Sequence, residues 1–156
     1  MKTKHYTVLM SLVFSASVMA TDLSCLVIGV SDGDTIRCLD SAKQQHRIRF
    51  DGIDAPESKQ AFGQKAKQAL SNLIYRQPVV VKVKGQDQYG REIGTVFLGN
   101  QNINQHMVVN GYAWAYRQYS SRYIPEEILA KAQKRGLWRD PNPIEPASFR
   151  HQKKGS

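Results

Sequence analysis

Residues 26–50 read LVIGVSDGDTIRCLDSAKQQHRIRF, and this stretch decides the fold. Apolar and polar residues alternate along it in three runs, which is the pattern of strands with one buried face. The runs cover residues 26–30, 35–39 and 46–50, and polar turns separate them. Because the connections are short, we expect three consecutive strands that pair as an antiparallel meander.

The rest of the chain adds a helix after the third strand, two more strands and two short helices. Apolar residues at a 3.6-residue period predict the first helix, and proline or glycine marks the ends of the others. The expected elements are a helix at residues 62–74, strands at 79–83 and 93–98, and helices at 103–110 and 126–135. Together they predict a mainly β, α+β fold, a five-stranded OB-fold-like barrel with three helices.

The first twenty residues have the pattern of a Sec signal peptide. Lys2 and Lys4 precede an apolar run at residues 7–14, and small residues at 18–20 suit signal peptidase. The alternative is a membrane anchor, but serines interrupt the apolar run, which is shorter than the roughly 20 residues that a span needs. We expect cleavage after Ala20 and a mature protein in the periplasm or outside the cell.

A length of 156 residues favours one domain, which we place at residues 21–140. Residues 141–156 contain prolines and basic residues, and we expect a surface tail that does not extend a helix. The formal net charge is +9, or +7 without Lys2 and Lys4. Such a charge suits a polyanionic partner, because basic side chains that neutralise phosphates release counterions. A basic exported protein that binds no nucleic acid would carry it equally well.

Cys25 and Cys38 are the two cysteines of the chain. If Asp32-Gly33 is the two-residue loop of a hairpin, Cys38 pairs with Val27 and lies one diagonal step from Cys25 on the same face. A disulfide between them is expected in an oxidising compartment. Two free thiols are the alternative.

Charged residues gather in three short segments, and each alone has an ordinary structural interpretation. Asp32-Gly33-Asp34 is a strong turn signal. Asp54 and Glu57 bracket Ala55-Pro56, which would stiffen a pair of carboxylates for a hard cation. The same residues would also suit the start of the next helix, with Asp54 as its cap and Glu57 facing its dipole. The third segment is Asp87-Gln88-Tyr89-Gly90-Arg91.

Taken together and in this order, the segments resemble the signature blocks of the thermonuclease (staphylococcal nuclease) family. The similarity continues beyond them and covers nearly all of the chain after residue 20. Several spaced blocks that match in order are far more specific than any one of them. The blocks are Ser31–Ile36, Ile48–Glu57, Asp87–Glu92, Val109–Trp114 and Lys134–Trp138.

The resemblance implies a Ca²⁺ site. Asp34 and Asp54 match the two aspartate ligands of the family, and Ala55 stands at the position whose backbone carbonyl is a third ligand. The family prototype has Thr there, which matters little if only the carbonyl coordinates. From residue types alone, Mg²⁺ or Mn²⁺ would suit the same oxygens, so the choice of Ca²⁺ depends on the resemblance.

The resemblance also implies the catalytic and substrate-binding residues. Glu57 matches the glutamate that is proposed as general base on the attacking water. Arg49 and Arg91 match the two arginines that bind the scissile phosphate, and planar guanidinium forks suit that role better than lysine does. Tyr89 and Tyr119 match positions on the substrate side.

Aromatic and basic residues interleave between Trp114 and Tyr123. They would form a stacking surface for bases, or alternatively close the core under the last helix. His46 and His106 lack the spacing of a metal pair and are interpreted as structural or surface residues.

The family resemblance implies an endonuclease that cuts DNA and RNA with little sequence preference and leaves 3′-phosphate ends. The signal-peptide pattern adds export, and a monomer is the default expectation. The rival from another class is a non-catalytic OB-like module that only binds nucleic acid. The enzyme is favoured because the chain has the complete set of five acidic and arginine residues, which are Asp34, Arg49, Asp54, Glu57 and Arg91. A small-molecule phosphodiesterase is a third possibility, and it would need a closed pocket.

Overall fold

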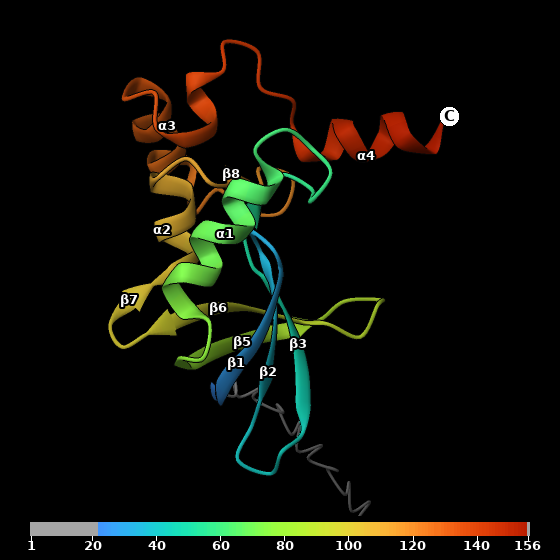
Figure 1. Cartoon of the computed structure of the whole chain (residues 1–156), viewed down its shortest axis with the longest axis vertical. Coiled ribbons are helices and arrows are strands. Elements are labelled where there is room, and N and C mark those ends of the chain that lie inside the picture. The colour runs from blue at the N-terminus through green and yellow to red at the C-terminus, as the bar shows by residue number, and fades with distance from the viewer. Residues whose placement is uncertain (1–21, 156) are drawn as a thin grey trace, which may run out of the picture.

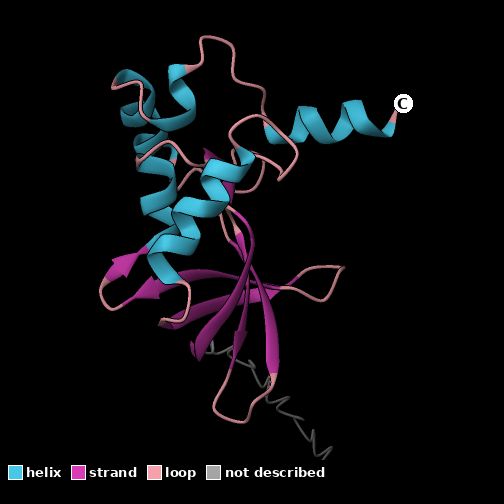
Figure 2. Ribbon diagram, in the orientation of Figure 1, coloured by secondary structure: helices cyan, strands magenta, loops and turns pink. Residues whose placement is uncertain are grey.

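The computed structural model describes residues 22–155, in which a strand barrel carries a group of helices on one side (Figures 1 and 2). The predicted signal peptide and its cleavage site lie outside the described residues. No helix within residues 22–155 combines the length and apolar character needed to cross a bilayer. The elements are β1 (Asp22–Asp32), β2 (Thr35–Leu39), β3 (Gln45–Phe50), β4 (Ile53–Asp54), α1 (Gly63–Ile74), β5 (Pro78–Gln86), β6 (Glu92–Leu98), β7 (Gln101–Asn102), α2 (Ile103–Val109), β8 (Trp114–Ala115), α3 (Ile124–Ala132), the 3-10 helix η1 (Gly136–Arg139) and α4 (Pro146–Lys154).

Five strands close into a barrel, which confirms the predicted fold class. Hydrogen-bonded neighbours follow the order β3-β2-β1-β5-β6, and β3 also pairs with β6 to complete the ring. The closing pair is parallel, with Arg49 beside Ile93, whereas the other pairs of the ring are antiparallel. Closure removes the free strand edges and holds Arg49 between two neighbours. The two-residue strands β4, β7 and β8 are too short to give a sequence pattern and were not predicted.

The first hairpin has two register shifts that decide where its turn lies. Val27 pairs with Cys38, as predicted. The register then shifts twice before the turn, so that Asp32 pairs with Thr35 and the turn is formed by Gly33-Asp34, one residue later than predicted. Bulges bend a strand and redirect its side chains. The aspartate in the turn is buried, with 4% of its surface exposed.

Cys25 and Cys38 form a disulfide that joins β1 to β2, with their Cα atoms 5.6 Å apart. The pairing of Cys38 with Val27 across the hairpin brings the two cysteines to one face, as the sequence predicted. Both lie in the barrel core. The prediction of a disulfide is therefore confirmed, and the alternative of two free thiols is wrong.

The apolar positions of the alternating runs become the barrel core. Val27, Ile36 and Ile48 come from the first three strands and are fully buried. The inserted helix α1 packs on β1 through its apolar stripe, in which Ala66, Leu70 and Ile74 are spaced four residues apart and are inaccessible to solvent. The helix therefore covers one side of the barrel and reaches the hairpin turn, where a Cβ atom on Gly33 would lie 2.9 Å from the Cβ of Ala66.

The predicted helices are present within a few residues of the expected bounds, but the basic tail is not irregular throughout. Residues 140–145 contain no helix, as expected, and α4 then begins at Pro146. A proline is well tolerated in the first turn of a helix, where its missing N–H has no intrahelical partner to lose. The described part of the chain therefore has four α-helices rather than three, and Figure 1 shows α4 projecting away from the other helices.

Candidate active site

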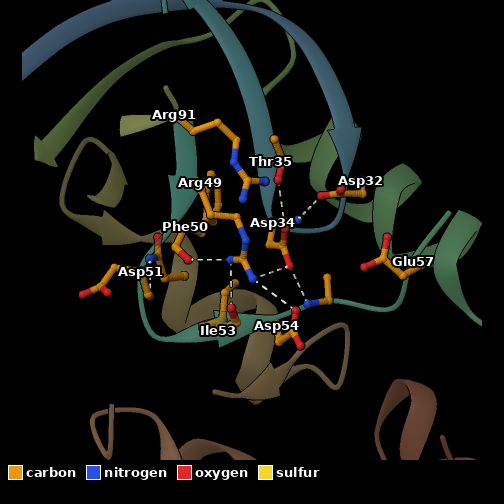
Figure 3. A network of polar contacts seen from close by, with 12 residues as sticks. Asp32, Asp34, Thr35, Arg49, Phe50, Asp51, Ile53, Asp54, Glu57 and Arg91 are labelled. Carbon is orange, nitrogen blue, oxygen red and sulfur yellow. Dashed lines mark hydrogen bonds and ion pairs between the residues drawn. The ribbon is translucent and has the colours of Figure 1, made fainter. Parts of the chain in front are cut away.

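Arg49 and two buried aspartates form the centre of the site (Figure 3). The Nη2 atom of Arg49 lies 3.4 Å from Oδ2 of Asp34 and 3.1 Å from Oδ1 of Asp54. Its Nη1 atom donates to the backbone carbonyls of Phe50 and Ile53, at 2.7 and 2.9 Å. The guanidinium is therefore fixed, and both carboxylates converge on one of its nitrogens.

The hairpin turn brings Asp34 against the segment that carries Asp54. Oδ2 of Asp34 accepts a hydrogen bond from the amide of Ala55 at 2.6 Å, and its Oδ1 accepts one from the Thr35 hydroxyl at 3.0 Å. A Cβ atom on Gly33 would lie 2.8 Å from the Cβ of Ala55, which is too close. Small residues at both positions let the two segments touch.

Asp54 and Glu57 belong to a loop before α1, and neither caps that helix. Asp54 lies in β4, pairs with β8 and is 2% exposed. The helix begins only at Gly63, with Phe62 at the capping position, so the capping interpretation is wrong. The Glu57 side chain is 37% exposed, and Figure 3 shows its carboxylate turned toward Asp34 and Asp54. Two acids of this loop thus face one site.

Arg91 reaches the site from the loop between β5 and β6. The carboxylate of Asp87 holds this loop, because Oδ1 accepts hydrogen bonds from the amides of Tyr89 and Arg91, at 2.9 and 3.0 Å. Its Oδ2 accepts a third from Nε of Arg91 at 2.7 Å. The segment Asp87–Arg91 therefore orients the guanidinium of Arg91 toward Arg49 (Figure 3).

These side chains share one open cleft of about 1050 Å³. Tyr89 and Tyr119 also line it and are 67% and 70% exposed. Tyr116 packs edge-on against Tyr119, and the Cζ atom of Arg49 lies 6.0 Å from the centre of the Tyr116 ring. By contrast, Tyr123 belongs to the core. The residues between 114 and 123 therefore divide between a cleft surface and core closure.

Burial and mutual repulsion raise the pKa values of two cleft aspartates, Asp32 and Asp54. Burial, then the neighbouring charge of Asp34, raises the pKa of Asp32 to about 8. Burial is also the main cause that raises the pKa of Asp54 above its ordinary value, against the lowering effect of hydrogen bonds from Arg150. Buried carboxylates that repel one another favour a bound cation, which would stabilise their charged forms.

The donor set suits a hard divalent cation in its chemistry. Within residues 22–155 no three side chains of His, Cys, Asp or Glu converge closely enough to form a metal site by themselves. The predicted set needs only two, because Asp34 and Asp54 supply carboxylates and Ala55 supplies a backbone carbonyl. All three are buried next to one another at the cleft, and oxygen donors with open positions are what Ca²⁺ prefers. Those three residues would hold the ion.

Arg150 of α4 also reaches this site, and sequence analysis did not assign it. Its Nη1 atom lies 3.1 Å from Oδ1 of Asp54 and 2.8 Å from Oε1 of Glu57, and its Nη2 lies 2.8 Å from Oδ2 of Asp54. Position 150 is 96 residues away from Asp54, so no local spacing could reveal the contact. A third arginine thus joins the cleft.

Comparison with known proteins agrees with the similarity seen in the sequence. A family model described as staphylococcal nuclease homologue matches residues 47–140. A Haemophilus influenzae protein named "Uncharacterized endonuclease" is 47% identical over 133 residues, which cover 84% of this chain and 75% of that protein. An Escherichia coli O157:H7 protein of the same name is 39% identical over 153 residues, 96% of this chain and 99% of its own. A Shigella flexneri "Micrococcal nuclease" is 43% identical over 143 residues, 83% and 82% of the two chains.

Proposed function

We propose that this chain, which belongs to the staphylococcal nuclease family, is an exported Ca²⁺-dependent endonuclease that cuts both DNA and RNA. Family membership and the nuclease relatives make it a nuclease of the thermonuclease type. The use of Ca²⁺, the export and the formation of 3′-phosphate ends go beyond that. The observation that carries the proposed catalysis furthest is a single cleft lined by Asp34, Arg49, Asp54, Glu57 and Arg91.

The arginines would supply positive charge where the phosphoryl oxygens gain negative charge during hydrolysis. Asp87 engages the Nε side of Arg91, which leaves the two terminal nitrogens available for a bidentate phosphate contact. Arg49 is locked by backbone carbonyls and carboxylates, so its charge does not have to reorganise when substrate arrives.

Glu57 would accept the proton of the attacking water. Its side chain is 37% exposed, so water can reach it, and it faces the two buried aspartates. A bound Ca²⁺ would polarise the phosphoryl oxygen as a Lewis acid. Asp34, Asp54 and the carbonyl of Ala55 would hold that ion.

Low sequence preference is supported by the way the cleft would contact a strand. Tyr89 and Tyr119 present exposed rings at the cleft, and aromatic rings stack on any base. Arginines contact the phosphate backbone, which carries no sequence information directly. We therefore propose single-stranded DNA and RNA as good substrates. A monomer is proposed as the active form by default.

Export is supported by two independent features. The residues before position 21 have the pattern of a signal peptide, and Cys25 is bonded to Cys38. Structural disulfides persist mainly in oxidising compartments. The mature protein is thus proposed to act in the periplasm or outside the cell.

The test is digestion of single-stranded DNA, duplex DNA and RNA by the mature protein in Ca²⁺ and in EGTA. We expect cutting only with Ca²⁺, and products that a polymerase extends only after phosphatase treatment. Glu57→Gln should reduce cutting by a factor of about 10² or more. Glu126→Gln, at a glutamate of α3 that does not line the cleft, is the matched control and should cut normally.

Unchanged cutting by Glu57→Gln would refute the proposed general base. Cutting in EGTA at the full rate would refute the metal requirement. Tight binding of nucleic acid without any cutting, in all three substrates, would instead favour the non-catalytic module.

A further inference from the structure

The guanidinium of Arg150 occupies the carboxylates that a cation would need. It contacts both oxygens of Asp54, at 3.1 and 2.8 Å, and Oε1 of Glu57 at 2.8 Å. Asp54 is 2% exposed, whereas the Arg150 side chain is 37% exposed. The guanidinium of a partly exposed side chain thus lies on a buried carboxylate.

The helix that carries Arg150 lies at the margin of the molecule. Ser148, His151 and Lys153 of α4 are exposed, and the helix projects away from the body in Figure 1. Pro146 at its start is buried, and the residues before it are tied by a hydrogen bond from Gln60 to the carbonyl of Ile144 at 2.6 Å. Ala147 and Phe149 of α4 are half-buried, and Arg150 adds its ion pairs to the contact between the start of the helix and the cleft.

A divalent cation and Arg150 would compete at Asp54. Coordination needs at least one Asp54 oxygen at about 2.4 Å from the ion. Both oxygens now accept hydrogen bonds from Arg150, and Oδ1 also accepts one from Arg49. The guanidinium and the ion would also repel each other strongly at a buried site of low dielectric constant. Asp54 cannot satisfy both partners fully.

We infer that Arg150 is an internal competitor for the metal, so that docking of α4 through Arg150 and binding of a divalent cation at Asp34 and Asp54 oppose each other. This inference depends on the proposed function, because it uses the same cation site. The coupling is reciprocal: a docked α4 weakens cation binding, and a bound cation releases α4 by the same free energy. At low cation concentration Arg150 neutralises the carboxylates of Asp54 and Glu57, and α4 stays docked on the cleft.

Calcium affinity measured by isothermal titration calorimetry on the mature protein tests the competition directly. Arg150→Gln should bind Ca²⁺ about tenfold more tightly than the parent protein, which lies within the usual range of allosteric coupling. Lys153→Gln removes the same charge from an exposed position of the same helix and should change the affinity by less than about twofold. Equal binding by Arg150→Gln would overturn the inference because Arg150 would then have no effect on the site, and weaker binding would overturn it because Arg150 would then support the site.

Hydrogen exchange of the parent protein gives a second readout that needs no variant. Saturating Ca²⁺ should accelerate exchange of the α4 amides and slow exchange in the segment around Ala55. Unchanged or slower exchange in α4 would overturn the inference.

Different results would contradict the competition by Arg150 and the proposed nuclease function. If parent and Arg150→Gln cut nucleic acid with the same Ca²⁺ affinity, the competition is wrong and the proposed function stands. If neither binds Ca²⁺ and neither cuts, the proposed function fails and the competition with it. Cutting that needs less Ca²⁺ in Arg150→Gln than in Lys153→Gln supports both.

Discussion

Among residues 22–155, two clusters of buried acid and arginine differ in how completely hydrogen bonds and ion pairs satisfy the acid. In the helical part, Glu127 is inaccessible to solvent and accepts hydrogen bonds from the amide of Ala115, from Arg117 and from Lys131. One carboxylate there faces two cations and an amide. In the cleft, four acids at positions 32, 34, 54 and 57 gather around the guanidiniums of Arg49 and Arg150.

The difference distinguishes a structural cluster from the cleft that we propose as the active site. The pKa of Glu127 is lowered overall, since hydrogen bonds from Lys131, Arg117 and the Ala115 amide outweigh burial, which is the largest single influence and acts to raise it. The pKa of Asp32 is instead raised to about 8, by burial and by Asp34. The cluster around Glu127, which we call the closed cluster, stabilises the charged form of its own carboxylate. The acids of the cleft are less completely neutralised, and a bound cation would stabilise their charged forms. Substitutions in the first should change stability, and in the second activity.

The largest effect is expected from Arg49→Lys in the cleft. A lysine keeps the charge but cannot hold two carbonyls and two carboxylates in one plane, as the guanidinium does. We expect kcat/KM for single-stranded DNA to fall about 10³-fold, or about 4 kcal/mol. Steady-state kinetics at saturating Ca²⁺ measure it. Arg117→Lys in the closed cluster is the control and should leave kcat/KM within about threefold; a loss under tenfold for Arg49→Lys would remove Arg49 from catalysis.

Glu127→Ala should lower stability and leave activity nearly unchanged, because it breaks the closed cluster. The Ala115 amide loses its partner and two cations lose theirs, which should lower the free energy of unfolding by about 3 to 4 kcal/mol. Urea denaturation measures this loss, and kcat/KM below the unfolding transition should stay within about threefold. A stable variant with lost activity would mean that the helical cluster contributes to the cleft, so that the two clusters do not act separately.

Local periodicity could predict the strands and helices of both regions, since apolar spacing follows directly from which face is buried. The family resemblance of their shared block, and not periodicity, groups Arg49, Asp54 and Glu57. Periodicity could not predict the parallel closure of β3 on β6, which depends on tertiary contact alone. Nor could it predict the register shifts that place the first turn one residue late.

The contacts that sequence analysis missed share one property, which is that their partners lie far apart in the chain. Arg150 is 96 residues away from Asp54, and the prolines before it suggested an irregular tail rather than a helix that returns to the cleft. His46 contacts Glu92 across 46 residues. A spacing pattern records which face a residue occupies, and it does not record which distant element that face meets.

Removal of the disulfide tests whether the barrel that carries the cleft needs its covalent link. Cys25 and Cys38 enclose a short loop, and replacing both with alanine should lower the free energy of unfolding by about 2 to 3 kcal/mol. Urea denaturation at pH 7 measures it, with the parent protein in reductant as a second version of the same change. Because neither cysteine lines the cleft, kcat/KM should be retained in the folded variant. No loss of stability in either form would mean that hairpin packing alone fixes the two strands.

The smallest effect is expected at His46, which joins β3 to its neighbours at the seam of the barrel. Its ring contacts Glu92 at 2.7 Å and Asp40 at 3.0 Å and is 14% exposed. Hydrogen bonds that the ring donates to these two carboxylates, first to that of Glu92, raise the pKa of His46 above its ordinary value of 6.5. The stabilisation from the charged ring is therefore complete below about pH 6.5 and is lost as pH rises through the raised pKa.

His46→Gln should thus destabilise the protein more at pH 5.5 than at pH 9. Both carboxylates are partly exposed and solvent screens the pair, so the difference between the two pH values should be about 0.5 to 1 kcal/mol. Urea denaturation of parent and variant at each pH measures it. His106→Gln is the control, because burial lowers the pKa of His106 and no carboxylate among its described contacts would favour its charged form. An equal loss at both pH values for His46→Gln would mean that the ring acts by packing, and that the seam depends on β3–β6 pairing rather than on charge.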